Sequence, residues 1–415
     1  MKQTERAAMA AFLQGEQARQ TAFLAALVRA PSDNPPGDCA AHAEMTARLL
    51  EGLGFTVERY PVPQDLVTAN GMVSATNLVV RQRFGPGPVI ALNAHGDVVP
   101  PGAGWQHDPY GAAVIDGWMF GRGVAVSKSD FATYSWALLA LMALGKKLAG
   151  TVELHFTYDE EAGGAIGPGW LLREGISKPD LAIGAGFSYA VVTAHNGCLH
   201  LEVQVTGRSA HAAMPFTGID ALQASTAILT ALYAQRPLLA KKVSAIEGIG
   251  SPQLTVGLIH GGINTNVVPD RVLFRLDRRM IPEEDPAVVE AELRALIEQA
   301  VLSVPGTVPG AVVQVRRILL AEPLVPDARS QILTDLLCQH ASVVMGEIVR
   351  ATGVPLYTDA RHYAAFGVPI VLYGAGPHTI EQANAHRADE RLALNDLYRA
   401  TEVLAYTLAD LLALD

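Results

Sequence analysis

The segment Val89–Pro101 reads VIALNAHGDVVPP, and its apolar first half runs directly into a histidine and an aspartate, His95 and Asp97. A second segment, Thr157–Gly164 or TYDEEAGG, follows another apolar stretch and carries three consecutive carboxylates. Each apolar stretch predicts a buried strand, so both polar groups lie just past the carboxyl end of a strand. Open α/β sheets bind their ligands at that edge. The two segments therefore predict an α/β sheet with a polar site at its carboxyl edge.

Around these segments, helical and strand patterns alternate through the first half of the chain. This alternation favours a sheet with helices on both faces. The expected helices are residues 6–29, 40–53 and 127–145, and the expected strands are residues 77–81, 89–94 and 151–157.

From about residue 196 the pattern changes to the order β-α-β-β-α-β. Strands are expected at 199–206, 254–260, 272–276 and 312–319, with helices at 219–235 and 286–302. A strand at 369–373 and an amphipathic helix from 395 return to the first pattern. We therefore predict a mixed-sheet α/β catalytic domain, residues 1–195 and 321–415, with an inserted α+β domain, residues 196–320.

The residue types at the predicted sheet edge suit a hydrolytic metal centre. An imidazole such as His95 ligates a metal ion, and a nearby carboxylate such as Asp97 orients it. Glu160 and Glu161 are adjacent, so their side chains point in different directions and can divide two tasks. One can bind the metal ion while the other takes a proton from water.

Further segments in a fixed order make the chain resemble the zinc aminoacylase family that includes acetylornithine deacetylase, succinyl-diaminopimelate desuccinylase and glutamate carboxypeptidases. The resemblance extends from about residue 20 to the end and implies the same two-part fold. Besides the two segments above, it rests on GWQHDPY (104–110), GRG (121–123), GRSAHAAMP (207–215), GGINTNVVP (261–269), DRR (277–279), TDAR (358–361) and AH (385–386).

The resemblance assigns roles in the catalytic domain. It implies that His95, Glu161 and His386 are metal ligands, that Glu160 is the general base, and that Asp97 fixes the tautomer of the histidine. The expected ion is a divalent transition metal, namely zinc, with manganese or cobalt as alternatives.

The resemblance also assigns roles to substrate-binding residues. It implies that His211 crosses to a partner subunit and stabilises an oxyanion, which makes the protein a homodimer through residues 196–320. Asn266 and Arg279 would hold the carbonyl and carboxylate groups of the substrate, since a guanidinium binds a carboxylate bidentately. Gly374 lies in a glycine turn that lets the backbone approach the substrate.

Two positions depart from the family pattern. Val126 stands where the family has a metal-bridging aspartate, and Ala185 falls where it has a second acidic ligand. Both losses affect the same metal, the one otherwise held by His95. Two dications about 3.5–4 Å apart repel strongly without a bridging carboxylate, so we expect one metal ion per chain. Asp130 and His378 are the candidate substitutes for the lost ligands.

These observations predict a metallo-amidohydrolase or deacylase that cleaves a C–N bond, of the amide or N-acyl amino acid type, in a small substrate that carries a carboxylate. Three alternatives stay open. They are a specialised aminohydrolase that acts on an amine of an activated ring, a metal-free binding or regulatory relative, and a conventional two-metal aminoacylase.

Composition excludes several other classes. The 415 residues carry a net charge of −10, which argues against nucleic acid or an anionic membrane as a partner. Three widely spaced cysteines, Cys39, Cys198 and Cys338, give no disulfide framework and favour a reducing compartment. The longest apolar run, residues 136–145, is about half a membrane span. We therefore expect a cytoplasmic protein.

Overall fold

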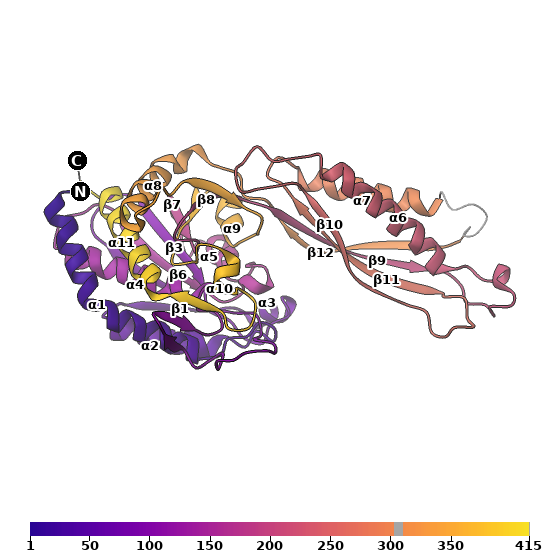
Figure 1. Ribbon diagram of the computed structural model, residues 1–415, viewed down its shortest axis with the longest axis horizontal. Helices are drawn as coiled ribbons and strands as arrows, with labels where there is room; N and C mark the ends of the chain where they lie inside the picture. Colours follow the sequence, from indigo (N-terminus) through magenta and orange to yellow (C-terminus); the bar gives the residue numbers. More distant parts are fainter. Residues whose placement is uncertain (303–309, 415) are drawn as a thin grey trace. The chain divides into compact units, whose positions relative to one another are not determined.

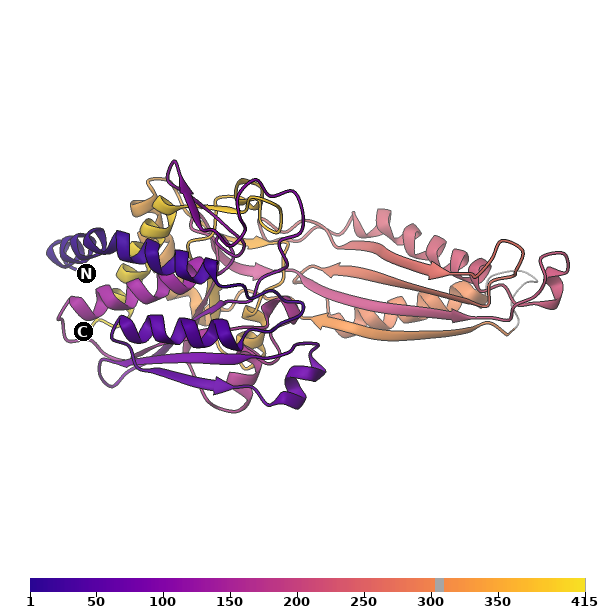
Figure 2. The same ribbon diagram turned by 90° about the horizontal axis from the view of Figure 1, so that it is seen from below.

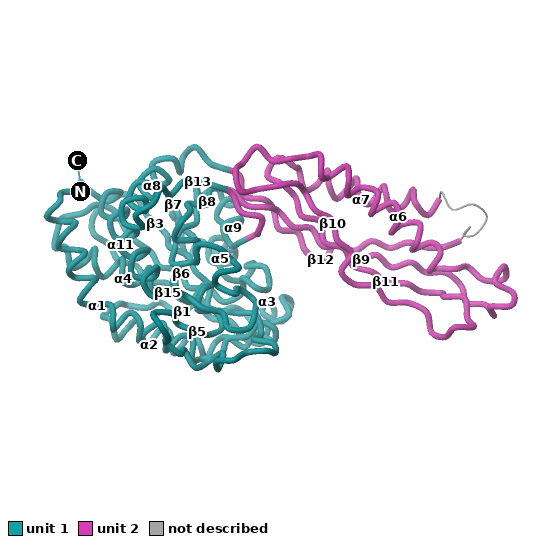
Figure 3. Tube along the Cα trace, viewed as in Figure 1, with its two compact units in different colours: residues 1–193, 326–352, 358–415 teal, residues 194–325, 353–357 magenta. Residues whose placement is uncertain are grey.

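The computed structural model describes residues 1–302 and 310–414, which form two compact units (Figures 1 and 3). The predicted fold class is confirmed, because the first unit is a mixed-sheet α/β fold and the second is an α+β fold. Unit 1 contains Met1–Thr193, Pro326–Thr352 and Thr358–Asp415, and unit 2 contains Ala194–Val325 and Gly353–Tyr357.

The centre of unit 1 is an eight-stranded sheet in the order β1-β2-β6-β3-β7-β14-β8-β13. Four neighbouring strands, β6, β3, β7 and β14, run parallel to one another. β1 and β2 pair antiparallel with their neighbours, and β8 pairs antiparallel with β14. The carboxyl ends of the four parallel strands therefore meet at one edge. The strands are β1 (Val57–Pro61), β2 (Thr76–Arg83), β3 (Val89–His95), β6 (Thr151–Thr157), β7 (Leu181–Gly184), β8 (Val191–His195), β13 (Ala351–Val354) and β14 (Ile370–Leu372).

Helices cover both faces of this sheet. Two successive side chains of β6 show this, because they contact different helices. Phe156 stacks on Phe131 of α4, with ring centroids 4.0 Å apart. The preceding side chain, His155, points to the other face and contacts the hydroxyl of Tyr363 in α9 at 2.7 Å. Since successive side chains of a strand point to opposite faces, α4 and α9 lie on opposite sides of the sheet.

One helical layer packs α4 between α1 and α11, and α8 continues the layer beyond α11. The sequence of α4 is apolar on almost every side, which is typical of a helix buried among other helices. In Figure 2, α2 lies along β1 and β2. The helices of unit 1 are α1 (Gln3–Arg29), α2 (Ala40–Gly52), α3 (Gln64–Ala69), α4 (Lys128–Ala143), α5 (Pro168–Arg173), α8 (Gln331–Met345), α9 (Ala360–Ala365), α10 (Ile380–Ala383) and α11 (Leu394–Leu411), with short 3-10 turns η1 (Glu160–Ala162) and η3 (Ala328–Ser330).

A small three-stranded sheet joins two distant parts of unit 1. It contains β15 (Arg391–Ala393), β5 (Trp118–Phe120) and β4 (Ala113–Ile115), in that order. Beside it, buried Arg122 and Glu390 form an ion pair of 2.6 Å, and Glu390 also accepts the N–H of Ala125 at 3.0 Å. These contacts hold the segment before Val126 against the segment that follows His386.

Unit 2 is a four-stranded antiparallel sheet in the order β10-β11-β9-β12, with two helices on one face (Figure 1). Leu199, Leu201 and Val203 alternate along β9 and pack into the core under α6 and α7. The elements are β9 (Gly197–Thr206), η2 (Pro215–Thr217), α6 (Ala221–Leu239), β10 (Gln253–Gly261), β11 (Arg271–Met280), α7 (Pro286–Leu302) and β12 (Val312–Ala321). Within the described parts of both units, none of the helices combines the length and hydropathy needed to cross a bilayer.

Candidate active site

The candidate site lies where the parallel strands of unit 1 end. His95 is the last residue of β3, and η1 with its two glutamates follows β6 after two residues. Ala185 follows β7, and Gly374 follows β14 after one residue. The parallel topology therefore brings together residues that are up to 279 positions apart in the sequence (374 minus 95).

The imidazole of His95 is buried and held at its Nδ1 atom. Nδ1 lies 3.0 Å from the carbonyl oxygen of Asp97 and 3.3 Å from its carboxylate oxygen Oδ1, while Nε2 lies 4.0 Å from Oε2 of Glu160. Ser127 fixes the backbone, because its hydroxyl accepts the His95 N–H at 3.0 Å. Burial lowers the pKa of His95, but the hydrogen bond to Asp97 and the charge of Glu160 outweigh it, so the net pKa is raised.

Asp97 is fully buried and acts as an acceptor for three donors. Its oxygens accept the backbone N–H groups of Glu160 at 3.2 Å and Glu161 at 3.1 Å, and the side-chain amide of Asn34 at 2.9 Å. A buried carboxylate with this many donors is firmly placed. Asp97 therefore fixes both the ring of His95 and the backbone of the two glutamates. Asn34 and Ser127 were not predicted as site residues, since each lies far along the chain from the residues that it contacts.

The site concentrates buried carboxyl groups. Burial raises the pKa of Asp159 and of Glu160 to about 7, and it also raises the pKa of Asp359. One oxygen of Asp159 and one of Asp359 are buried without a hydrogen-bond partner among the described residues. Uncompensated negative charge of this kind is costly in a protein interior. A cation bound nearby would relieve that cost.

The second glutamate faces the histidine near the C-terminus. Oε1 of Glu161 lies 3.5 Å from Nε2 of His386, and this hydrogen bond raises the pKa of the histidine. His386 has a positive φ of 60°, an uncommon backbone for a non-glycine residue. Its side chain is 55% exposed, so one side of the site is open to solvent.

The arrangement fits a divalent metal ion. One ligand atom each from His95, Glu160 and Glu161 lie within 4.8 Å of one another. His386 joins this group through its contact with Glu161. Imidazole and carboxylate groups are the donors that such ions take in hydrolytic sites. The structure thus brings all five predicted catalytic-domain residues together: His95, Asp97, Glu160, Glu161 and His386.

Val126 and Ala185 lie in segments that contact the strand ending at His95, and neither offers a donor side chain. Ser127, the neighbour of Val126, contacts both the backbone N–H and the backbone carbonyl of His95. The N–H of Ala185 donates to the carbonyl of Asn93, two residues before His95, at 2.8 Å. Both side chains pack partly buried against the hydrophobic core of unit 1.

The two candidate substitutes have other contacts. Asp130 is buried and accepts the N–H of Ala375 at 2.7 Å, while burial raises its pKa to about 7. A Cβ atom added to Gly374 would meet Oδ1 of Asp130 at 2.1 Å, so the packing of Asp130 requires a glycine there. His378 is half-exposed and lies 3.3 Å from Glu347.

The remaining predicted residues belong to unit 2 and do not lie together. The His211 loop pairs with the Asn266 loop, because the N–H of Ala212 donates to the carbonyl of Asn266 at 3.0 Å. Arg279 lies at the other end of β11, where its Nε donates to Asp277 at 2.9 Å. Both His211 and Asn266 are exposed. The sheet therefore separates the predicted oxyanion donor from the predicted carboxylate-binding arginine.

A model of the peptidase family M20/M25/M40 matches residues 91–410, well over half of the chain. The chain belongs to this family. The M20 chain is 28% identical to the succinyl-diaminopimelate desuccinylase of Gluconacetobacter diazotrophicus over 391 residues, which cover 91% of this chain and 93% of that protein.

Solved structures share the fold of this M20 chain. The M20 family metallo-carboxypeptidase Sso-CP2 from Sulfolobus solfataricus has a TM-score of 0.74 at 17% identity, covering 95% of this chain and 98% of that one. The Bacillus subtilis YXEP protein, a dinuclear metal binding peptidase, has a TM-score of 0.68 at 17% identity, covering 96% and 99%. The M20 chain is accordingly a metal-dependent hydrolase of amide bonds in small substrates.

Proposed function

We propose that this M20 enzyme cleaves an amide of the N-acyl amino acid type in a small substrate that carries a carboxylate, using one bound ion, zinc. The observation that carries the proposal is the position of Glu160. Its carboxylate lies 4.0 Å from Nε2 of His95, and its pKa is raised by burial to about 7. A general base works best when its pKa lies near the operating pH.

The contacts of the two glutamates support a division of roles. Glu161 faces His386 at 3.5 Å, so Glu161 and His386 can share an ion with His95. Glu160 then remains to take a proton from the attacking water and pass it to the leaving nitrogen. A divalent ion bound here would lower the pKa of a bound water molecule and polarise the substrate carbonyl.

The proposal of a single ion rests on Val126 and Ala185. Both are apolar residues in segments that contact the strand ending at His95, and neither can bridge two ions or complete a second ligand shell. Asp130 also supports a single ion, because its carboxylate already accepts the backbone N–H of Ala375. Imidazole and carboxylate donors suit zinc, with manganese and cobalt as alternatives.

The substrate class follows from Arg279 and from the relatives. The Nε atom of Arg279 donates to Asp277, and this contact does not use its two Nη groups, which can bind a carboxylate as a fork. Curated relatives are named succinyl-diaminopimelate desuccinylases, and an N-succinyl amino acid fits the proposed chemistry.

We further propose a homodimer that shares its sites. Arg271 and Arg279 are eight steps apart on β11 (279 minus 271), or about 27 Å at about 3.4 Å per residue. The ladder continues past Arg271 to the loops of Asn266 and His211. If His211 and Arg279 act on the same substrate, they must come from two chains. Three free cysteines support the proposal of a reducing, cytoplasmic location.

Metal content and turnover, measured together, test the proposal. The purified protein is reconstituted with zinc, manganese or cobalt and assayed on a panel of amides with and without a substrate carboxylate. We expect one hydrolytic ion per chain and turnover of carboxylate-bearing N-acyl amino acids. Turnover with two ions at this site would support a conventional two-metal enzyme instead, and a site with neither ion nor turnover would support a binding relative.

Restoring the two missing carboxylates tests the single-ion proposal directly. The double variant Val126→Asp with Ala185→Glu should bind one ion more per chain than the unchanged protein, measured by equilibrium dialysis and metal analysis. Val126→Asp alone places a charge against the hydrophobic core, so its metal content should stay the same while its stability falls. An unchanged protein that already holds two ions at this site would contradict the proposal.

A further inference from the structure

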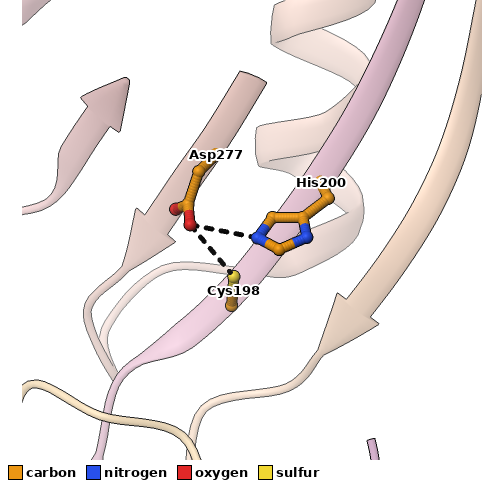
Figure 4. A group of neighbouring side chains, drawn as sticks. All are labelled: Cys198, His200 and Asp277. Atoms are coloured by element: carbon orange, nitrogen blue, oxygen red, sulfur yellow. Dashed lines mark hydrogen bonds and ion pairs between the residues drawn. The ribbon is translucent and has the colours of Figure 1, made fainter. Parts of the chain in front are cut away.

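Unit 2 contains a second group of metal-ligand side chains, formed by Cys198, His200 and Asp277. Cys198 and His200 are two residues apart on β9, so they point to the same face of the sheet. Asp277 of β11 pairs directly with His200 in the antiparallel register. The intervening Leu199 packs under the helices on the other face, so the group lies on the face away from α6 and α7 (Figure 4).

The three side chains converge on a single oxygen. Oδ2 of Asp277 lies 3.0 Å from Nε2 of His200 and 3.9 Å from Sγ of Cys198. All three ligand atoms lie within 4.8 Å of one another. The thiol is buried, whereas His200 and Asp277 are 34% and 30% exposed, which leaves one side of the group accessible to solvent.

We propose that Cys198, His200 and Asp277 bind a zinc ion in unit 2, with ligands other than those of the hydrolytic centre. Thiolate, imidazole and carboxylate are the three zinc donors that proteins use, and the thiolate distinguishes this set from a magnesium or calcium site. With zinc bonds of about 2.0–2.3 Å, tetrahedral geometry places N and O about 3.3 Å apart, and S and O about 3.6 Å apart. The observed N–O distance of 3.0 Å and S–O distance of 3.9 Å each lie within a few tenths of an ångström of those values.

The charges around the group suit a dication. A thiolate at Cys198 and the carboxylate of Asp277 supply two negative charges. Arg279 donates through Nε to both oxygens of Asp277, at 2.9 Å to Oδ1 and at 3.2 Å to Oδ2, and Oδ2 also faces the thiol and the imidazole. The shorter contact is the one to Oδ1, so zinc can bind Oδ2 while the arginine keeps its contact with Oδ1. Three protein ligands leave a fourth position for water or a small ligand.

The hydrogen bonds of His200 favour its protonated form when no ion is bound. The hydrogen bond to Asp277, followed by that to Cys198, raises the pKa of His200 to about 9. Zinc needs a neutral imidazole, so binding at neutral pH releases a proton from His200. The apparent affinity should consequently rise with pH up to about 9.

The rest of this sheet face contains no comparable group among the described residues, since its charges are paired with one another. Glu202 contacts Arg275 at 2.8 Å and Arg316 at 2.8 Å, and Gln204 accepts from Arg271 at 2.6 Å. Arginine pairs of this kind hold a sheet face together without a metal ion. A cysteine and a histidine replace that pattern only at the end of β9 nearest Gly197.

The test uses cobalt(II) as a spectroscopic probe for zinc, titrated into the metal-free full-length protein. A thiolate ligand gives cobalt a strong near-ultraviolet charge-transfer band, which the nitrogen and oxygen ligands of the hydrolytic centre do not. We expect this band in the unchanged protein, and zinc should abolish it by competition. Cys198→Ser should lose the band and bind one ion fewer per chain. The matched control Cys338→Ser, on α8, should keep both properties.

His200→Gln provides an independent variant if Cys198→Ser unfolds, because His200 is partly exposed and its replacement keeps the buried thiol. It should weaken cobalt binding at least tenfold and reduce the protons released on binding. The absence of the band in the unchanged protein, or its persistence in Cys198→Ser, would overturn the proposal. Neither readout depends on turnover, so this result and the test of the hydrolytic function can fail separately.

Discussion

Glu160 is the residue on which the proposed chemistry depends most. Glu160→Gln keeps the size of the side chain but removes the group that takes a proton, so the variant should keep its fold and metal content and lose at least about 10²-fold in kcat. Exposed Glu298 offers a matched control, and Glu298→Gln should retain full activity. Steady-state kinetics with metal analysis measures both. Near-normal turnover in Glu160→Gln would remove this residue from the mechanism.

The contact between Gly374 and Asp130 predicts a specific packing defect. Gly374→Ala would place a methyl group 2.1 Å from Oδ1 of Asp130 and disturb the hydrogen bond from Ala375. Overpacking of this kind costs about 1–3 kcal/mol of unfolding free energy. Gly52→Ala is the control, because nothing lies within 4 Å of its added Cβ. Urea unfolding should separate the two variants, and equal stability would show that Asp130 can move aside.

At the scale of single residues, sequence could assign ligand types but not their surroundings. His95, Asp97, Glu160, Glu161 and His386 were predicted from motifs, and the structure brings them together. Their roles stay predictions. The burial of Asp130 was not foreseen, because its position one turn into a helix does not reveal that the loop after β14 covers it.

The Cys198, His200 and Asp277 group was also missed at this scale. The alternation of a cysteine and a histidine in β9 was visible, but the strand register that brings Asp277 opposite His200 links residues 77 positions apart.

At the scale of elements, β6 carries a buried carboxylate that links stability to pH. Glu153 accepts from Arg81 at 2.8 Å, contacts His155 at 3.0 Å and accepts from Ser177 at 2.5 Å. Burial opposes its ionisation, but these partners outweigh burial and lower its pKa from 4.5 to about 2. A lowered folded-state pKa stabilises the protein above the unfolded pKa. That contribution is lost as the pH falls from about 4.5 towards 2.

Glu153→Gln tests this linkage. At pH 7 the variant should be destabilised by an amount on the order of 3 kcal/mol, and the difference from the unchanged protein should shrink as the pH falls from about 5 to 2.5. Comparing the unfolding free energies of the two proteins isolates the contribution of Glu153. The other buried carboxyl groups are present in both, and their raised pKa values change stability with pH in the opposite direction. Urea unfolding at a series of pH values measures it. A difference that is constant with pH would contradict the linkage.

The elements were partly predictable. Every helix and strand expected from the sequence is present, and α1 and β9 begin and end within three residues of their predicted limits, whereas α6 and β11 each extend four residues further. The helix α8 and the strands β1, β7, β8 and β13 were not predicted. Periodicity sustained over many residues gives a strong signal. The three-residue strands β4, β5 and β15 were missed because they are too short to show a period. The order of the strands in the sheet could not be predicted either, since β14 lies between β7 and β8 although it follows both by many residues in the sequence.

At the scale of the whole molecule, the shared-site proposal predicts complementation between two inactive variants. His211→Ala lacks the proposed oxyanion donor and Glu160→Gln lacks the proposed base. A mixed dimer would contain one site with both defects and one with neither. Mixing equal amounts of the two proteins and allowing subunit exchange should restore up to about a quarter of normal activity, because half of the dimers are mixed and each has one intact site of two. The amide assay measures it.

Two controls make the complementation decisive. Each variant incubated alone under the same conditions should stay inactive. Light scattering should report a dimer before and after exchange. A fully active monomer, or a mixture of exchanged dimers that stays inactive, would contradict a site that is shared between chains.

The ladder between β9 and β11 also restricts how this part of the chain can change in length. An antiparallel ladder adds about 3.4 Å per residue and reverses the side chain's direction at each step. Removing one residue from each strand would present His211 on the opposite face of the sheet, whereas removing two would shorten the reach by about 7 Å and keep the face. Insertions or deletions that preserve function should therefore come as matched even numbers in both strands.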